Sequence, residues 1–400
     1  MIWTGTAIVA LALAAENMPG MPDIFSADAV AQQARAAHPV PGLVCALVDR
    51  NGVVAVGADG VRVAGGTDAI TVRDRMHLGS CLKAMTATLA ATFVAEGSLR
   101  WDSTVGDVLG ATYPAMDPAW KPVTLAELLM HRGGVAGSPP ADAWRTAFAC
   151  TDPPQQCRAA FIATLLAGAP GSPRGGFQYS NQGYAVAGRM MEVVAKQDYE
   201  ALIAARLFAP LGIRDFGFGP PSRVDPASPK GHDPGGTVAD IDNPSAIAPA
   251  GTLHMPVGEW AKFIAFHLGA TPPKELAGAA KELAALHRPS EDAAKYAMGW
   301  LVAQRPWGGT VLNHAGSNSK WFCVAWLAPE KGFAVLAACN EGGDAATKAC
   351  DAACAALIGE RVKAAKAAPA APANAPASPA APVAPVAPAA PAAPPAAPAR

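Results

Sequence analysis

Two serine–lysine pairs with the spacing Ser-x-x-Lys are candidate nucleophile sites, Ser80 with Lys83 and Ser317 with Lys320. Ser80 follows a strand-like run and opens an apolar helical stretch, whereas no helical stretch follows Ser317. Because residues three apart share one face of a helix, Lys83 is expected to lie over Ser80. Burial and the positive helix end both favour a neutral amine, which can accept the serine proton. Taken alone, the pair is more typical of a capping serine beside a surface lysine.

The run Tyr179-Ser180-Asn181 is a second candidate, again where a loop meets a helical stretch. A phenol has a pKa of about 10, so Tyr179 acts as a base only where nearby cations lower that pKa. Lys83 is a cation that can do so. Asn181 offers a substrate amide both a donor and an acceptor. A core tyrosine followed by a capping asparagine is the alternative interpretation.

The third candidate is the run His314-Ala315-Gly316-Ser317, which ends a late strand-like segment. The small side chains of Ala315 and Gly316 leave the backbone open to an extended substrate. The backbone N–H of Ser317 can then stabilise an oxyanion. A histidine at a strand end, followed by a turn of small residues, would give the same run.

Taken together and in this order, the three runs resemble the motifs of the penicillin-recognising serine hydrolases. The likeness is to the branch that holds class C β-lactamases, D-Ala-D-Ala carboxypeptidases, D-aminopeptidases and related esterases. Further stretches at residues 125–134, 170–179, 250–253 and 296–300 also resemble this family, and the likeness covers about residues 26–362. The joint pattern is far more specific than any one run.

The resemblance implies a serine hydrolase that works through a covalent acyl-enzyme, with no cofactor and no metal. It implies the catalytic residues Ser80, Lys83 and Tyr179 and the substrate-binding residues Asn181, His314, Gly316 and Ser317. Tyr179 would be the general base and then the acid for the leaving group. The backbone N–H groups of Ser80 and Ser317 would form the oxyanion hole. His131 is expected to be structural, because it precedes the Gly133-Gly134 turn.

His314 stands where many members of the family have a lysine. A lysine would hold a full positive charge for a substrate carboxylate, whereas an ordinary histidine is mostly neutral at pH 7. We therefore expect a D-amino-acid peptide or an ester as the main substrate more than a β-lactam, although β-lactams remain candidate acylating agents. Residues 214–250 are expected to border the pocket.

Two other functions compete with this hypothesis. A binding or sensor module on the same fold would acylate without efficient turnover, or present an inactive pocket tethered by the tail. A Ser-His-Asp hydrolase of the α/β class is disfavoured, because the sequence has no G-x-S-x-G motif.

Composition excludes several partners. The formal net charge is −1, so the electrostatic attraction that drives nucleic-acid binding is lacking. None of the 8 histidines forms a zinc motif, and Asp240-Ile241-Asp242 fails as a calcium loop because Pro244 takes the next ligand position. We expect a small-molecule or cell-wall peptide substrate, no nucleic acid, no transmembrane span, and a monomer. The 8 cysteines leave the pairing open, with Cys150 and Cys157 as the best local pair.

Both ends of the chain differ from its middle. Residues 1–15 hold a short apolar run typical of a signal peptide, with small residues near Ala14 and Ala15 for cleavage, although no basic residue precedes it. This predicts a periplasmic or secreted protein. Residues 363–400 are rich in alanine and proline, which predicts an extended or disordered tail.

The intervening residues 16–362 are expected to form one serine hydrolase domain. Strand-like runs occur near residues 42–56 and again at 297–304, 310–314, 320–327 and 333–339, with helical pieces between them. Helices are expected at about 26–38, 80–96 and 344–362. The fold class is therefore α/β (α+β): a β-lactamase-like antiparallel sheet flanked by N- and C-terminal helices. Its α/β part would span about 26–99 and 246–362, with a mostly helical insertion at about 100–245.

Overall fold

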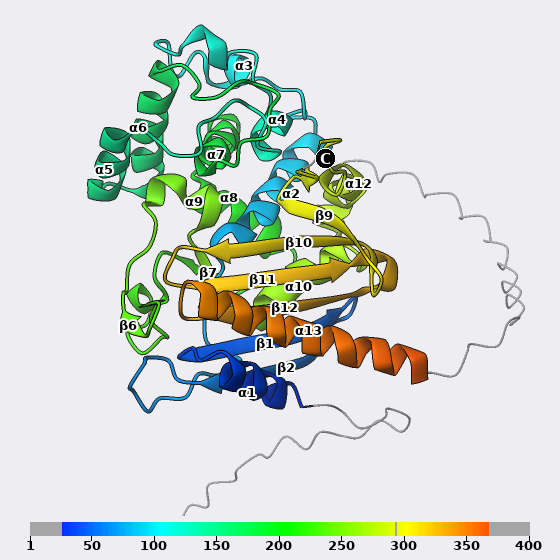
Figure 1. The fold of residues 1–400 in the computed structure, drawn as a ribbon. Coiled ribbons are helices and arrows are strands. Elements are labelled where there is room, and N and C mark those ends of the chain that lie inside the picture. The colour runs from blue at the N-terminus through cyan, green and yellow to red at the C-terminus, as the bar shows by residue number, and fades with distance from the viewer. Residues whose placement is uncertain (1–25, 293, 368–400) are drawn as a thin grey trace, which may run out of the picture.

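A computed structural model describes residues 26–292 and 294–367 of the 400-residue chain (Figure 1). The expected signal peptide and most of the expected alanine–proline tail lie outside these residues. Within the described residues, no helix is both long enough and apolar enough to cross a membrane.

The centre of the fold is a seven-stranded antiparallel sheet in the order β2-β1-β12-β11-β10-β9-β8. Its strands are β1 (Gly42–Asp49), β2 (Gly52–Gly60), β8 (Tyr296–Ala297), β9 (Trp300–Arg305), β10 (Gly309–Ser317), β11 (Phe322–Ala328) and β12 (Phe333–Cys339). Strand β1 pairs with β12 along its length, so segments from the two ends of the domain close one sheet. The predicted fold class is confirmed.

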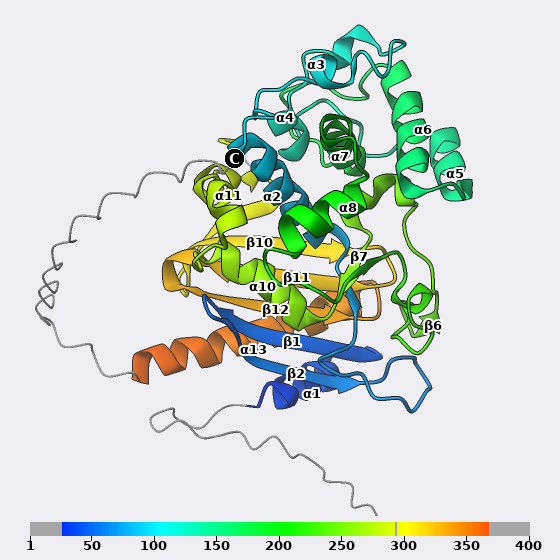
Figure 2. The same cartoon turned by 180° about the vertical axis from the view of Figure 1, so that it is seen from behind.

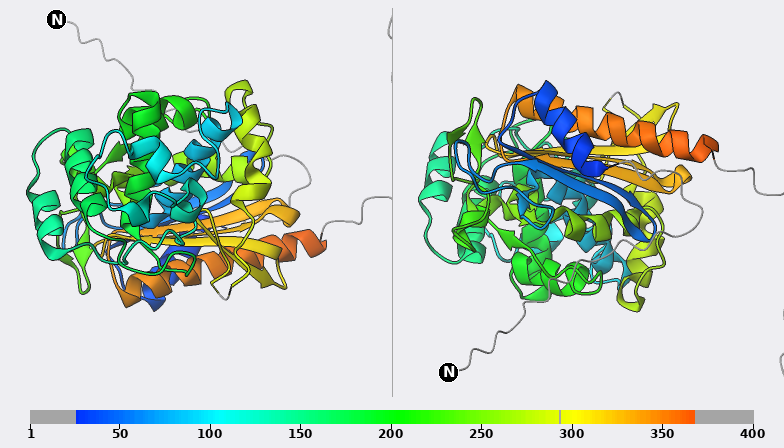
Figure 3. Two further views of the ribbon diagram at one scale, coloured as in Figure 1. Left: turned by 90° about the horizontal axis from the view of Figure 1, so that it is seen from above. Right: turned by 90° about the horizontal axis from the view of Figure 1, so that it is seen from below.

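Helices cover both faces of this sheet. The helices α1 (Ala27–Ala37) and α13 (Asp344–Ala367) pack on one face, and α2 (Leu82–Ala95) and α10 (Val257–His267) pack on the other (Figures 2 and 3). The side chains of β1 alternate between two cores: Val44 and Ala46 face α10, whereas Leu43 and Cys45 face α1 and α13. Such a strand is buried on both sides.

The helical region lies beyond one long edge of the sheet (Figure 1). Its helices are α3 (Val105–Leu109), α4 (Leu125–Leu129), α5 (Ala141–Ala149), α6 (Pro154–Ala167), α7 (Asn181–Ala195) and α8 (Tyr199–Ile203). Cys150 and Cys157 form a disulfide between α5 and α6, as their spacing suggested. Arg158 on α6 is fully buried and donates to the carboxylates of Glu192 and Glu200, which joins α6 to α7 and α8.

Short elements complete the described chain. They are the strands β3 (Met76–His77), β4 (Gly217–Phe218), β5 (His232–Asp233), β6 (Thr237–Val238) and β7 (Leu253–Met255), and the helices α9 (Ala248–Gly251), α11 (Ala277–Lys281) and α12 (Leu283–Leu286). The 3-10 turn Gly79–Cys81 leads directly into α2.

Three element ends differ from the expectations. Strand β10 continues to Ser317 because β11 pairs with it there, although Ala315 and Gly316 have little intrinsic preference for strands. Strand β2 runs to Gly60 through its pairing with β1. Helix α13 continues to Ala367, so the first residues assigned to the tail are helical. Alanine and lysine, which fill that stretch, are strong helix formers, and its first proline is Pro369.

Candidate active site

Ser80 and Lys83 meet at the start of helix α2. Ser80 lies in the 3-10 turn Gly79–Cys81 and is partly accessible, whereas the Lys83 side chain is fully buried. The Lys83 Nζ lies 2.9 Å from the Ser80 Oγ. The pair therefore consists of an accessible hydroxyl above a buried amine, which is the arrangement expected of an activated serine.

The Lys83 amine is held by neutral oxygens from two other segments. Its Nζ donates to Asn181 Oδ1 at the start of α7 and to the carbonyl of Ala250 in α9, each at 2.7 Å. Neither acceptor is a carboxylate, so neither offsets the cost of burying a charge. Burial lowers the pKa of Lys83 from 10.5 to about 7. At neutral pH much of this lysine is a free base.

Tyr179 lies beside the same amine, with Lys83 Nζ 4.9 Å from the centre of the phenol ring. Burial raises the pKa of Tyr179 above its ordinary value, although a hydrogen bond with Ser80 acts in the opposite direction. This differs from the lowering by Lys83 that the sequence allowed, and the reason is the depth at which the phenol is buried. Tyr179 is therefore a phenol that holds its proton.

His131 packs against Tyr179. Its ring lies 4.2 Å from the Tyr179 ring, and its Nδ1 accepts the backbone N–H of Ser180 at 3.1 Å. Burial lowers the pKa of His131 well below 6.5, with Lys83 and His314 adding to the effect. The contacts agree with a neutral, structural histidine that holds the turn into α7.

Strand β10 lies against the turn that carries Ser80 and forms one wall of the candidate site. It pairs with β9 only as far as Asn313, and from His314 to Ser317 it is paired with β11 alone. Gly79 has a φ of 45°, and a Cβ built on it would overlap the Ser317 amide nitrogen. A Cβ on Gly316 would overlap the Leu78 carbonyl oxygen. Only glycine at these two positions lets the serine turn approach the strand that carries Ser317.

The His314 side chain points into the core beside this wall. It is only 5% exposed, its Nδ1–H donates to the Ala315 carbonyl at 2.7 Å, and its Nε2 accepts from the Tyr296 hydroxyl at 3.1 Å. Burial, helped by Lys83, lowers the pKa of His314 to about 3. The ring thus offers a substrate neither a charge nor a free polar atom. The wall of the cleft at this point is formed by the backbone of β10.

The second serine–lysine pair has no such geometry. The Ser317 Oγ accepts the backbone N–H of Ser319 at 2.9 Å, and Lys320 pairs with Asp233. The structure therefore separates the two pairs as their sequence contexts suggested.

Sequence reasoning missed three groups that hold the site together. These are the Ala250 carbonyl, the Tyr296 hydroxyl, and a buried pair formed by His77 and Asp242. A backbone carbonyl carries no residue signature. Asp242 was considered only as part of a calcium loop, and its partner lies on the segment that precedes Ser80. Among the described residues, no cluster of histidine, cysteine and carboxylate side chains is suited to a metal ion.

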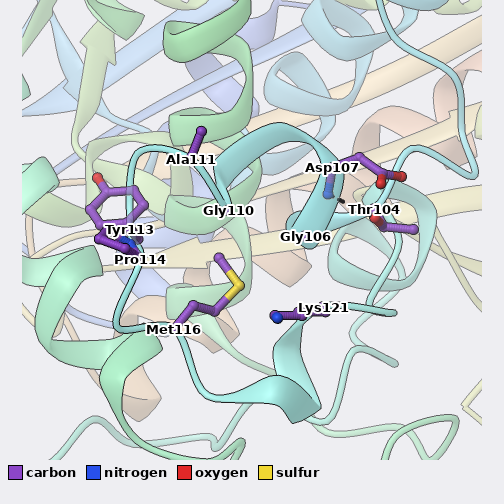
Figure 4. Close-up of a pocket in the computed structure, with 9 residues that line it drawn as sticks. All are labelled: Thr104, Gly106, Asp107, Gly110, Ala111, Tyr113, Pro114, Met116 and Lys121. Atoms are coloured by element: carbon purple, nitrogen blue, oxygen red, sulfur yellow. Dashed lines mark hydrogen bonds between the residues drawn. The ribbon is translucent and has the colours of Figure 1, made fainter.

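A separate hollow of about 350 Å³ lies in the helical region (Figure 4). It is lined by Thr104, Gly106, Asp107, Gly110, Ala111, Tyr113, Pro114, Met116 and Lys121. This hollow contains none of the residues around Ser80.

Curated proteins resemble parts of the chain. Penicillin-binding protein 4 of Amycolatopsis lactamdurans is 34% identical over 180 residues, which is 45% of this chain and 45% of that protein. Lovastatin esterase of Penicillium rubens is 30% identical over 170 residues, 38% of this chain and 41% of that protein. The chain thus matches less than half the length of either relative.

Solved structures share the fold over most of the chain. D-alanine carboxypeptidase AmpC of Burkholderia cenocepacia superposes with a TM-score of 0.69 and 17% identity, covering 84% of this chain and 97% of that one. A class C β-lactamase of Rhodobacter sphaeroides gives a TM-score of 0.68 and 18% identity, covering 84% and 99%.

The family model described as Beta-lactamase matches residues 27–359, which include every element that positions Ser80. The three runs found in the sequence converge within this match. The chain belongs to the Beta-lactamase family.

Proposed function

We propose that this protein hydrolyses an ester or amide bond through an acyl-enzyme on Ser80. The observation that carries the proposal is the 2.9 Å contact between Ser80 Oγ and the buried Lys83 amine, whose pKa burial lowers to about 7. A serine hydroxyl becomes a nucleophile when a nearby base accepts its proton, and such a base works best when its pKa is close to neutral pH.

Acylation begins when Lys83 Nζ accepts the Ser80 proton and Oγ attacks the substrate carbonyl carbon. The carbonyl electron pair moves onto oxygen, where the backbone N–H groups of Ser80 and Ser317 stabilise the negative charge. Asn181 Oδ1 is occupied by Lys83, so the Asn181 amide N–H groups are the ones directed to the substrate.

Collapse of the tetrahedral intermediate expels the alcohol or amine. Tyr179 gives its phenolic proton to this leaving group and recovers a proton from the Lys83 ammonium. A phenol with a raised pKa suits the role of a donor better than that of the first base. Water then attacks the ester of Ser80 with the same groups acting in reverse, which releases the acid and restores the hydroxyl.

The substrate preference follows from the neutral wall at β10. His314 supplies no cation for a carboxylate, because its ring is buried, neutral and bonded to Tyr296. We infer that neutral esters are the best acyl donors, D-amino-acid peptides come next, and β-lactams are the poorest. The similarity to a lovastatin esterase supports the first class.

The decisive experiment assays purified protein against nitrophenyl esters, D-alanyl peptides and a chromogenic cephalosporin. Ser80→Ala is expected to abolish turnover and labelling by a fluorophosphonate probe, while Ser98→Ala, an exposed serine on the loop after α2, retains both. Full activity in Ser80→Ala would refute the proposal.

A penicillin-binding sensor is the second candidate, favoured by the 34% identity to penicillin-binding protein 4. Intact mass separates the two functions. A hydrolase shows a transient adduct with release of product, whereas a sensor keeps the acyl group on Ser80. An absence of any adduct would favour an inactive binding module.

We also propose that the protein is exported to the periplasm or secreted. The disulfide between Cys150 and Cys157 supports an oxidising compartment, and residues 1–15 resemble a signal peptide. N-terminal sequencing of protein from the cell envelope or medium tests this, with cleavage near Ala14 or Ala15 as the expected result. Full-length protein confined to the cytoplasm would contradict it.

A further inference from the structure

A buried histidine–carboxylate pair lies directly behind the turn that carries Ser80. His77 in β3 and Asp242 in the loop before α9 are buried, with side chains 0% and 2% exposed, and His77 Nε2 lies 2.8 Å from Asp242 Oδ2. The backbone N–H of Gly79 donates to His77 Nδ1 at 3.1 Å. The pair is therefore hydrogen-bonded to the backbone of Gly79, the residue before Ser80.

These contacts define the state of the His77 ring. A backbone N–H can only donate, so His77 Nδ1 must accept and carries no proton. The ring proton is then on Nε2, which donates to Asp242. Both ring nitrogens are occupied, so His77 is not available as a base for Ser80, and the pair does not form a Ser-His-Asp triad.

Asp242 extends the network to the other side of the cleft. Its Oδ1 accepts from the Asn318 side-chain Nδ2 at 2.9 Å and from the Asn243 backbone N–H at 2.7 Å. Asn318 directly follows Ser317. Hydrogen bonds from these donors offset the free-energy cost of burying the Asp242 carboxylate.

The network thus joins the two segments that carry the oxyanion donors. One end holds Gly79, next to the Ser80 N–H, and the other holds Asn318, next to the Ser317 N–H. Hydrogen bonds between N–H groups and a developing oxyanion weaken when either donor is displaced by a fraction of an ångström.

We propose that His77 and Asp242 are positioning residues that set the separation of the two oxyanion donors, Ser80 N–H and Ser317 N–H. This inference rests on the proposed acyl-enzyme function of Ser80. It predicts a loss of transition-state stabilisation without a matching loss of substrate binding when the network is broken.

Asp242→Asn is the sharpest variant because it keeps the size of the side chain. If the asparagine oxygen faces His77, its NH₂ group meets the donors of Asn243 and Asn318. If the oxygen faces Asn243, the NH₂ group meets His77 Nε2–H. Each orientation leaves a donor facing a donor, and a change of His77 tautomer only moves the conflict to Gly79. Asp102→Asn is the control, since it makes the same change in an exposed carboxylate that pairs with Arg100 on the loop after α2.

Asn318→Asp is a second variant that tests the other end of the network. It keeps the Oδ1 that accepts the Lys320 and Trp321 N–H groups, but it places a carboxylate oxygen against Asp242. It changes no contact of the buried His77. Because this side chain is partly exposed, folding is less at risk than with Asp242→Asn.

The assay uses the full chain with the best nitrophenyl ester and a phenylboronic acid, whose tetrahedral adduct on Ser80 places an oxygen in the oxyanion hole. For Asp242→Asn and Asn318→Asp we expect kcat to fall roughly tenfold to a hundredfold with KM nearly unchanged, and boronate affinity to fall by a similar factor. Asp102→Asn is expected to match the wild type in both.

Failure of this inference is distinguishable from failure of the proposed function. If wild-type turnover depends on Ser80 but Asn318→Asp and folded Asp242→Asn keep the kcat and boronate affinity of the control, the positioning role is wrong. A lower melting temperature with unchanged kcat would likewise show a merely structural role. If Ser80→Ala retains activity, the proposed function and the inference both fall.

Discussion

Lys83 Nζ lies 2.9 Å from Ser80 Oγ while the lysine side chain has no exposure to solvent. The three oxygens around the amine are a hydroxyl, an amide and a backbone carbonyl, so burial dominates its proton affinity. The same desolvation that makes this lysine a base also destabilises its charged form in the folded protein. The pH dependence of the activity and that of the free energy of unfolding should therefore both reflect the titration of Lys83.

The pH dependence of kcat/KM should follow the neutral form of Lys83. Since its pKa is lowered to about 7, kcat/KM should rise about tenfold for each pH unit below that value and level off above it. His314, with a pKa lowered to about 3, should add no step near neutrality. A pH–rate profile on a neutral ester checks this, with Lys83→Arg as the variant that loses the activity. A profile independent of pH from about 5 to about 9 would contradict the role of Lys83.

The free energy of unfolding should also depend on pH through Lys83. Its pKa is about 7 when folded and near 10.5 when unfolded, so between these values the unfolded chain binds more protons. Stability should therefore rise with pH in this window, by roughly 1 kcal/mol per pH unit, and the destabilisation should be complete below about pH 7. Urea unfolding at several pH values measures the slope. Lys83→Met should lack this contribution, and an unchanged slope in that variant would show that other groups cause it.

Tyr179→Phe should impair substrates according to their leaving groups. A nitrophenolate leaves without a proton, whereas an alkoxide or an amine needs one. We expect a fall of roughly 10²- to 10⁴-fold for alkyl esters and a clearly smaller one for nitrophenyl esters. Tyr113→Phe, which removes a hydroxyl that donates to Ala159 in the helical region, is the control. Equal losses for both leaving groups would assign Tyr179 to another step.

Gly316→Ala should disable the enzyme by separating β10 from the serine turn. The added methyl group would overlap the Leu78 carbonyl oxygen, and it would also crowd Cys323 and Cys81. We expect at least a hundredfold loss of kcat/KM together with a lower melting temperature, since overpacking costs about 1–3 kcal/mol. Gly258→Ala on α10 is the comparison, because nothing lies within 4 Å of its added methyl. Equal behaviour of the two variants would show that the approach of β10 is not tight.

Arg158→Met should destabilise the helical region more than any exposed pair does. Arg158 is fully buried between Glu192 and Glu200, so its removal takes the cation from Glu200 and leaves Arg189 as the cation beside the buried Glu192. The expected cost is about 3–5 kcal/mol. Arg145→Met breaks an exposed pair with Asp142 and should cost less than about 1 kcal/mol. Chemical denaturation gives both values, and a cost of Arg158→Met near that of Arg145→Met would mean that the carboxylates find other partners.

Much of the fold was predictable because local patterns and tertiary packing agree. Ser26 caps α1, where its side chain accepts the Ala29 N–H, and Asn51-Gly52 turns β1 into β2. The pattern also separated the two serine–lysine pairs, since only Ser80 opens a helix. These features depend on residues close together in the chain.

What was not predictable depends on distant partners. His77 and Asp242 are far apart in the sequence, and neither carries a pattern that indicates the other. The inward orientation of His314 requires the Tyr296 hydroxyl, and the pKa of Tyr179 depends on how deeply the ring is buried. Such properties arise only once the segments have packed.

The pairing of β1 with β12 imposes an order on biosynthesis. The ribosome makes Ser80 early, but the partner of β1 and the strand that carries Ser317 are among the last parts of the domain to emerge. The edge of β1 that pairs with β12 stays unpaired during that interval, and an unpaired strand edge is prone to aggregation. A polypeptide terminated before β10 would contain Ser80 and Lys83 but would lack the Ser317 N–H, one of the two proposed oxyanion donors. Such truncated chains should therefore be inactive.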